Sequence, residues 1–319
     1  MKLIESSVEI IPQEIGLLGA YKQVELAGRV CYKSEDKICE GSAKKMVDFL
    51  ISRGHLSPLE HGTIYLHFRY NSPINDINYL KYTKIERFYR NNHYSRVVNT
   101  TEDHFNHDIY ITTNARVIVE NNRQDDLQYW CEPTEHHIKR HTVRFVCSRS
   151  VSHELVRHRA MSFCQTSQRY VNYSLGKFNS EIQFVVPEWV KTRTFEVAKC
   201  INPLTKTSNS YILDEPTLID TIRIHMLALD RAVCCWYDNL KRSEGDYMYL
   251  LTDECGLKPQ EARSVLPNDT QTEVIVTGYN DKDGWKNFFD LRCSTAAHPD
   301  IRVLADDLHK QFIEKGIIK

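Results

Sequence analysis

The chain has 319 residues, of which 41% are hydrophobic and 26% are charged, a composition typical of globular proteins rather than disordered ones. Its 41 Lys and Arg residues nearly balance its 42 Asp and Glu residues, and the net charge is -1. This balance argues against a surface drawn as a whole to nucleic acid or to an anionic membrane. We find no apolar run near the roughly 20 residues of a membrane-spanning helix, so no membrane association is expected.

The N-terminal residues do not follow the pattern of a signal peptide, and we expect a cytoplasmic location. The ten cysteines include no Cys-x-x-Cys pair, so neither a zinc ribbon nor a thioredoxin-type redox pair is expected. They are interpreted as reduced thiols that fill the core. His137, His141 and His153 come closest to a zinc-binding set. Because His141 begins a strand-like segment, the helical spacing fails and no metal is predicted.

The first part of the chain shows clear periodicity. Apolar residues recur at helical spacing over 18–31 and 43–53, and Gly54 is suited to end the second helix. A polar turn with a proline follows at 55–62. Residues 63–70 then alternate strictly between apolar and polar side chains, which predicts a half-buried strand.

Residues 71–140 differ from the rest. They are rich in Asn, Tyr, Arg and His and show little sustained periodicity. We interpret them as an elaboration inserted into a core domain. Within them, residues 109–120 are predicted to form a short hairpin that turns at Thr113 and Asn114.

The remainder alternates between strands, helices and loops. A strand is predicted at 141–149, then a helix at 150–159 capped by Ser150, then a loop at 161–174. The later elements are helices at 218–243, 259–266, 283–292 and 299–316 and a strand at 272–278. Since βαβ alternation is absent, these elements predict an α+β fold with mixed helices and an antiparallel-type sheet. We treat residues 1–319 as a single catalytic domain with an insertion at about 71–140.

The segment that follows residue 156 carries the strongest chemical signal. Arg157, His158 and Arg159 stand in a row, and a stretch rich in hydroxyls and amides leads to Arg169. The planar fork of arginine binds phosphate in a bidentate way, and Ser, Thr and backbone N–H groups can complete an anion cradle. The set is suited to a phosphorylated ligand. On physical grounds alone, a solvated basic helix end explains it equally well.

The segment reads Arg157-His158-Arg159, seven residues and then Ser167, followed by Arg169-Tyr170. This pattern resembles the signature of flavin-dependent thymidylate synthases, in which the same Arg-Tyr pair follows. Three further segments resemble the family and follow its order: RGHLSPLEH at 53–61, EARSVLP at 261–267 and NFFDLR at 287–292. The resemblance covers about 20–70 and 141–315 and leaves 71–140 unmatched.

The resemblance implies a fold, an activity and an assembly. Such enzymes are FAD-dependent methyltransferases that convert dUMP to dTMP. Methylenetetrahydrofolate donates the one-carbon unit, and NADPH reduces the bound FAD. The family forms homotetramers in which several subunits build each active site.

The resemblance also implies site residues, position by position. Those expected to contact FAD are His55, Ser57, Arg157, His158, Arg159, Gln165 and Asn287. Those expected to contact dUMP are Glu154, Arg157, Gln165, Thr166, Ser167, Gln168, Arg169, Arg263 and Arg292. Among them Arg263 is assigned to the phosphate. Arg292 is the expected catalytic residue, because a cation beside the uracil favours loss of the N3 proton.

Three positions depart from the family pattern. Gly278 falls near a position that is asparagine in some members. Glu154 stands where a glutamine is common, and Gln165 stands where glutamate is usual. A carboxylate beside a phosphorylated ligand opposes binding unless a cation pairs with it. His158, one helical turn further on, is expected to be that cation.

Alternative functions follow from the same residues. The departures at Glu154 and Gln165 leave open a related flavin- and folate-dependent C5 modification, such as hydroxymethylation. A nucleic-acid-binding module would use the signature and the mixed rings and cations of residues 88–96, although the net charge argues against it. A serine hydrolase built on Ser167 and His158 lacks the Gly-x-Ser-x-Gly elbow.

Overall fold

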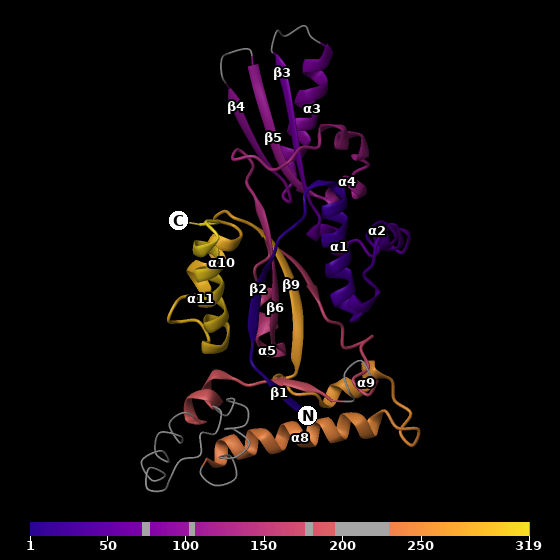
Figure 1. Cartoon of the computed structure of the whole chain (residues 1–319), viewed down its shortest axis with the longest axis vertical. Coiled ribbons are helices and arrows are strands. Elements are labelled where there is room, and N and C mark those ends of the chain that lie inside the picture. Colours follow the sequence, from indigo (N-terminus) through magenta and orange to yellow (C-terminus); the bar gives the residue numbers. More distant parts are fainter. Residues whose placement is uncertain (72–76, 102–105, 176–180, 195–229, 319) are drawn as a thin grey trace.

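A computed structural model of the chain describes residues 1–71, 77–101, 106–175, 181–194 and 230–318 (Figure 1). Its described part combines helices with mainly antiparallel sheets, which confirms the predicted α+β class. Of the helix predicted at 218–243, residues 218–229 lie outside the described residues. The described helix there, α8, spans Arg231–Leu250 and extends beyond the predicted end.

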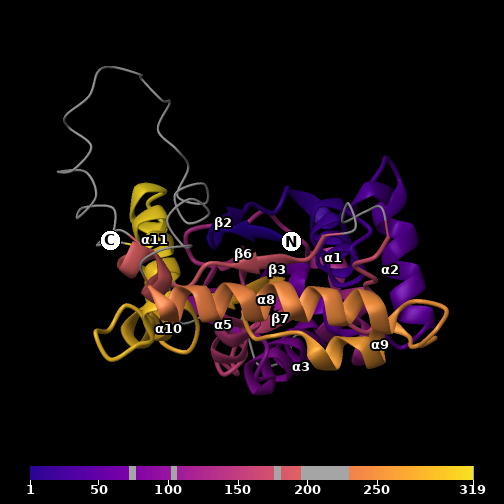
Figure 2. The same cartoon turned by 90° about the horizontal axis from the view of Figure 1, so that it is seen from below.

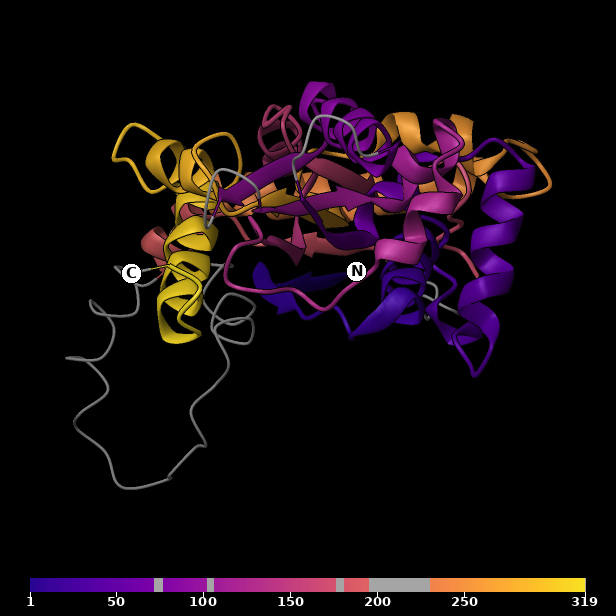
Figure 3. The same cartoon turned by 90° about the horizontal axis from the view of Figure 1, so that it is seen from above.

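A four-stranded antiparallel sheet forms the centre. Its strands are β2 (Ser7–Ile11), β6 (Arg140–Ser148), β9 (Gln271–Tyr279) and β7 (Ser162–Gln165), in that spatial order. Helices α10 (Trp285–Arg292) and α11 (Pro299–Glu314) lie on one side of the molecule, and α1 (Gly16–Tyr32) and α2 (Ser42–Ser52) lie on the opposite side (Figure 3).

Strand β9 is buried along its whole length, because helices cover both faces. Val274 and Val276 belong to the core formed with α10 and α11, whereas Ile275 packs with Ala27 and Val30 of α1. Alternate side chains of one strand therefore stabilise two separate layers.

A second sheet of three strands rises above the first (Figure 1). Its order is β3 (Thr63–Asn71), β5 (Asn106–Asn114) and β4 (Arg96–Thr101), and α3 (Ile77–Asn91) packs against it. The predicted insertion thus adds a helix and two strands to β3. Strand β3 is more buried than predicted: both Ile64 and Tyr65 are buried, because the Tyr65 ring packs against His137 at 5.2 Å between centroids.

Three local predictions were wrong. Residues 109–120 do not form a hairpin, since Asn114 ends β5 and its side chain accepts from the Val117 N–H at 3.0 Å, which caps α4 (Ala115–Glu120). Ser148, rather than Ser150, caps α5 (Arg149–Leu155), and that helix ends earlier than predicted. Residues 162–165 form β7 rather than loop, because they pair with β9.

The remaining elements complete the lower part. Helix α8 runs across the lower end of the molecule (Figure 2) and packs on the core beneath the parallel pair β1 (Lys2–Ile4) and β8 (Gln183–Val185). The short elements are η1 (Glu35–Lys37), η2 (Ser57–His61), η3 (Gln124–Tyr129), α9 (Pro259–Ala262) and η5 (Arg263–Val265). Gly54 has a φ of 68° just beyond α2, which confirms it as the end of that helix. No helix among the described residues has the length and apolar character needed to cross a membrane.

Tyr279, at the end of β9, joins the two sheets. Its buried hydroxyl lies 2.8 Å from the carbonyl oxygen of Tyr94 and 2.9 Å from that of Thr112, to which it donates. The guanidinium groups of Arg96 and Arg140 lie over its ring, 4.5 and 5.3 Å from the centroid. Burial raises the pKa of Tyr279 to about 12, so the hydroxyl is a neutral donor at physiological pH.

Removing this hydroxyl is expected to loosen the upper sheet. Tyr279→Phe deprives two backbone carbonyls, of which that of Thr112 is buried, of their shared donor, so the free energy of unfolding should fall by about 1–3 kcal/mol. Urea denaturation measures this loss, and amide hydrogen exchange should quicken in β4 and β5. Tyr170→Phe is the control, because its exposed ring carries a hydroxyl without a hydrogen bond among the described residues. Equal losses in the two variants would contradict the assigned role.

Candidate functional site

The signature residues form a tight turn after α5. Val151 and Leu155 of that helix belong to the main core, which holds its end in place. The N–H of His158 then donates to the Leu155 carbonyl at 3.1 Å. This turn buries the His158 ring and leaves Arg157 and Arg159 exposed.

The side chain of Arg292, at the end of α10, holds Glu154 and His158 together. Its Nε donates to His158 Nε2 at 3.0 Å, its Nη1 to Glu154 Oε2 at 2.7 Å, and its Nη2 to the Glu154 carbonyl at 3.0 Å. Three of the five N–H donors of the guanidinium are thus used, and each terminal nitrogen keeps one for a ligand. The predicted pairing of Glu154 with His158 is wrong, because Arg292 is the cation that pairs with Glu154.

His158 is a neutral group in this arrangement. Since a guanidinium can only donate, Nε2 of His158 accepts, and the ring proton resides on Nδ1. Burial, and then the charge of Arg292, lower the pKa of His158 to about 4. The ring also packs edge-on against Phe288, with centroids 5.1 Å apart. His158 therefore orients Arg292 as a hydrogen-bond acceptor.

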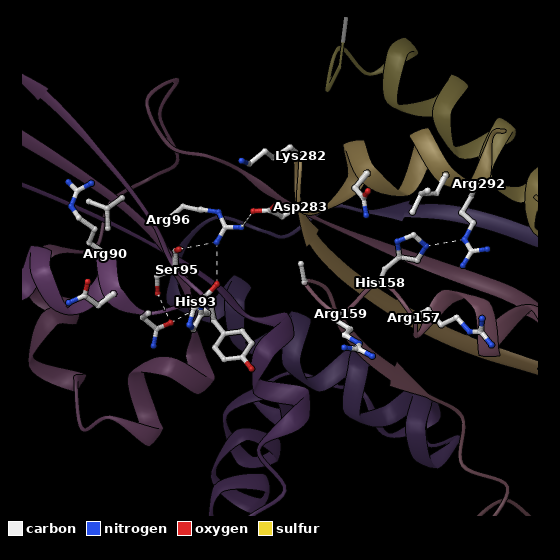
Figure 4. A pocket seen from close by; sticks show the side chains of 17 residues that line it. Arg90, His93, Ser95, Arg96, Arg157, His158, Arg159, Lys282, Asp283 and Arg292 are labelled. Carbon is white, nitrogen blue, oxygen red and sulfur yellow. Dashed lines mark hydrogen bonds and ion pairs between the residues drawn. The ribbon is translucent and has the colours of Figure 1, made fainter.

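A cavity of about 1070 Å³ opens beside this cluster (Figure 4). It lies between the α5–β7 turn, the loop from β9 into α10, and the loop from α3 to β4. Five of the predicted site residues line it: Arg157, His158, Arg159, Asn287 and Arg292. The opposite wall consists of residues 90–97, from the predicted insertion. In Figure 4, Arg90, His93 and Arg96 lie on one side and His158 and Arg292 on the other.

The cavity carries positive charge without a matching number of carboxylates. Some of its arginines are paired: Arg90 with Glu86, Arg96 with Asp281 and Asp283, and Arg292 with Glu154. By contrast, the side chains of Arg157, Arg159 and Lys282 form no hydrogen bond or ion pair with any described residue. Three uncompensated cations in one hollow favour an anionic ligand.

The other predicted residues gather around the end of β7 and do not line the cavity. The Nε2 of Gln165 donates to the Ser152 hydroxyl at 2.8 Å. Thr166 is buried, and its hydroxyl donates to a backbone carbonyl of α1 at 3.3 Å. Ser167 and Gln168 are half-buried and Arg169 is exposed. In this chain Gln165 and Thr166 thus have partners within the fold.

His55 and Ser57 are exposed near this second group. The Nδ1 atom of His55 lies 3.3 Å from the hydroxyl of Tyr32, and the Tyr32 ring packs on Tyr170 at 5.3 Å between centroids. Sequence reasoning missed Tyr32, because no local pattern distinguishes it from other rings at the end of a helix.

Arg149 is a second residue that sequence reasoning missed. Its guanidinium is half-buried and lies 3.5 Å from the Thr166 carbonyl. Burial lowers the pKa of Arg149, Tyr173 opposes that shift, and the charge of the exposed Arg263 adds to it. The two arginines are therefore close enough to repel each other. They lie far apart along the chain, so no spacing could have linked them.

The candidate zinc set does not assemble. His137 is buried, and its ring nitrogens contact the Leu66 carbonyl and the Thr134 N–H, each at 3.1 Å. His141 packs against Phe312. Across the part of the chain that the structure describes, no three His, Cys, Asp or Glu residues are grouped to hold a metal ion.

Comparison with known proteins adds a family match. The sequence model of the thymidylate synthase complementing protein family matches residues 17–73 and 128–315. A flavin-dependent thymidylate synthase of Mycolicibacterium gilvum is 29% identical over 168 residues, 52% of this chain and 54% of that protein. One of Pyrococcus furiosus is 28% identical over 173 residues, 54% of each. The chain spans about half the length of the curated relatives it matches.

One solved structure covers nearly all of the chain. It is a UMP/dUMP methylase, PolB, from Streptomyces cacaoi bound with 5-Br dUMP, and it covers 98% of this chain and 93% of its own. Its sequence identity is 18% and its TM-score is 0.40.

The pairing of Glu154 with Arg292 can be tested by stability. Glu154→Ala removes a charge-assisted hydrogen bond between two largely buried side chains, so the free energy of unfolding should fall by about 1.5–3 kcal/mol. Glu154→Gln keeps an acceptor and should lose less. The control is Asp48→Ala, which breaks an exposed pair with Lys44 and should cost about 0–1 kcal/mol. Indistinguishable urea denaturation curves for Glu154→Ala and wild type would refute the pairing.

Proposed function

The chain belongs to the thymidylate synthase complementing protein family, and we propose that it is a flavin-dependent thymidylate synthase. In this proposal it methylates dUMP to dTMP, methylenetetrahydrofolate donates the carbon, and NADPH reduces the bound FAD. Two curated relatives carry that enzyme's name. The observation that carries the proposal is the cavity in which Arg157, Arg159 and Arg292 meet.

The cavity fits a flavin dinucleotide in size and charge. Its volume of about 1070 Å³ lies just above the range of ordinary small-molecule sites, roughly 300–1,000 Å³. Arg157 and Arg159 have free guanidinium forks, which match pyrophosphate oxygens. Asn287 is half-buried beside them and adds an amide donor and acceptor. When bound, the flavin would supply the hydride that completes the methyl group.

Arg292 is suited to the uracil ring. Its two remaining N–H groups can donate to the ring, while Glu154 and His158 hold its orientation. A cation fixed there lowers the pKa of the N3–H and stabilises the anion that forms. The carboxylate of Glu154 cancels part of that charge, which makes Glu154 a determinant of nucleotide choice in this proposal.

Arg263 is suited to the phosphate of dUMP. It lies near enough to Arg149 to disfavour that residue's charge, and a phosphate placed between them would relieve the repulsion. Arg149 therefore joins Arg263 as a proposed phosphate ligand. The other proposed dUMP contacts near the end of β7 are Gln165, Thr166, Ser167, Gln168 and Arg169.

The separation of the two groups supports a site shared between chains. The signature group lines the cavity, while His55, Ser57 and the residues after β7 do not. In a homotetramer, the second group of one chain can complete the cavity of another, with FAD held by His55, Ser57 and Gln165 of neighbouring chains. We place this enzyme in the cytoplasm, where dUMP and the reduced cofactors are available.

A related hydroxymethylation of C5 is the second candidate. Glu154 favours it, because a carboxylate beside the reacting ring can orient a water molecule. The nucleic-acid-binding alternative is weaker: Tyr89 of the ring-rich segment 88–96 is buried in the upper core, and residues 90–97 line the cavity.

Product analysis tests the activity. Purified protein incubated with dUMP, methylenetetrahydrofolate and NADPH should form dTMP, identified by chromatography and mass spectrometry. Arg292→Ala should lower kcat by about 10²–10³, as removal of a transition-state donor does, while circular dichroism shows a folded protein. Hydroxymethyl-dUMP as the product would establish the second candidate. A failure to form either product from flavin-loaded protein would overturn both.

The shared site predicts complementation between inactive variants. Arg157→Ala damages the cavity group, and Arg169→Ala damages the group after β7. When the two variants are unfolded and refolded together, about a quarter of the sites should combine an intact cavity from one chain with an intact second group from another, and activity should return to that extent. Arg157→Ala mixed with Arg159→Ala is the control, because both changes fall on the same wall and no intact site can form. Absence of recovery in the first mixture would place all contacts within one chain.

A further inference from the structure

One wall of the cavity has no counterpart in the family match. That match leaves out residues 74–127, and residues 90–97 of this stretch line the cavity opposite the signature. The insertion therefore contributes directly to the candidate site, although its sequence lies outside every segment that resembles the family.

The wall is held in a defined position. The Nε of Arg96 donates to Asp281 Oδ2 at 2.8 Å, and the Tyr279 hydroxyl contacts the Tyr94 carbonyl at 2.8 Å. Within the loop, the side-chain oxygen of Asn92 accepts from the N–H of Tyr94 at 2.9 Å. Contacts from the core and within the loop thus restrain the backbone of the wall, which preorganises it for a ligand.

The side chains that line the cavity here include an aromatic ring, an imidazole and a lysine without a partner. The Tyr94 ring is 58% exposed although its backbone is tied to the core. Across the cavity edge, Lys282 is exposed and has no partner among the described residues, and the His93 ring likewise makes no hydrogen bond or ion pair with them. An exposed ring, an imidazole and an unpaired lysine in one cavity suit a nucleotide, since the base can stack and the phosphates can pair with charge or accept hydrogen bonds.

We propose that Tyr94, His93 and Lys282 bind an adenosine diphosphate group. Tyr94 stacks on the adenine, and Lys282 with His93 faces the phosphates. Such a group occurs in both FAD and NADPH, and in either case the wall extends the cavity that holds the signature. This proposal rests on the proposed function in that it places a dinucleotide in the same cavity.

Direct binding measurements test the wall apart from catalysis. ADP, FAD and FMN are titrated into flavin-free protein, with heat or flavin fluorescence as the signal. Stacking on a ring is worth roughly 1–3 kcal/mol, so Tyr94→Ala should weaken ADP binding about 5- to 150-fold. Tyr94→Phe should restore binding, and Lys282→Ala should weaken it with a smaller salt dependence.

Matched controls exclude indirect effects. Tyr249→Ala removes a ring that is 52% exposed on α8, and Lys286→Ala removes an exposed cation of α10 that does not line the cavity. Both should bind ADP like wild type. Size-exclusion chromatography and thermal unfolding of each variant show whether assembly and fold are intact.

The comparison of ligands identifies the source of the group. If FAD supplies it, Tyr94→Ala weakens FAD but leaves FMN affinity unchanged. If NADPH supplies it, FAD affinity is unchanged and the dissociation constant for NADPH rises. Wild-type affinity of Tyr94→Ala for ADP, FAD and NADPH would overturn the proposal, as would a change in assembly with unchanged ADP affinity, which would make the ring a subunit contact. If ADP binding depends on Tyr94 but the protein forms no dTMP, the nucleotide-binding role of Tyr94 would stand and the proposed function would be rejected.

Discussion

The buried hydroxyl of Tyr279 is the contact on which the arrangement of this protein depends. Tyr279 is the last residue of β9, which is buried over all nine residues and pairs with β6 and β7. From that point the chain enters α10, which carries Arg292, while the hydroxyl ties the strand to Tyr94 of the α3–β4 loop and to Thr112 of β5. Since one strand end positions both the inserted sheet and α10, the two walls of the cavity keep their separation.

The arginines of the cavity differ in whether another side chain pairs with them. Glu154 cancels part of the charge of Arg292, and an uncharged His158 orients its guanidinium, so its remaining N–H groups point in a fixed direction. Arg157 and Arg159, one residue to either side of the buried His158, keep their charge free. This division suits a ligand with two parts: one that needs oriented donors beside a reacting ring, and one that needs positive charge beside phosphates.

Much of the fold follows from local pattern. The helices at α1, α2, α10 and α11 and the strands at β3, β6 and β9 lie within a few residues of their predicted ranges, because apolar periodicity reports directly on the buried face. The failures came where a partner distant in sequence decided the structure. Residues 162–165 look like a polar loop, yet pairing with β9 makes them a strand. Asn114 looks like a turn residue, yet it serves as a helix cap.

The sequence by itself determined the α+β class, the Arg-His-Arg signature and the family, because residue types at short spacing carry that information. Only the tertiary structure decided which groups meet. Glu154 and Arg292 are 138 positions apart, and they pair because α10 packs against the core that α5 also joins. The insertion forms a cavity wall for the same reason: Arg96 and Asp281, 185 positions apart, meet only once β9 is buried. Packing brings such groups together regardless of their separation along the chain, so no sequence pattern reveals them.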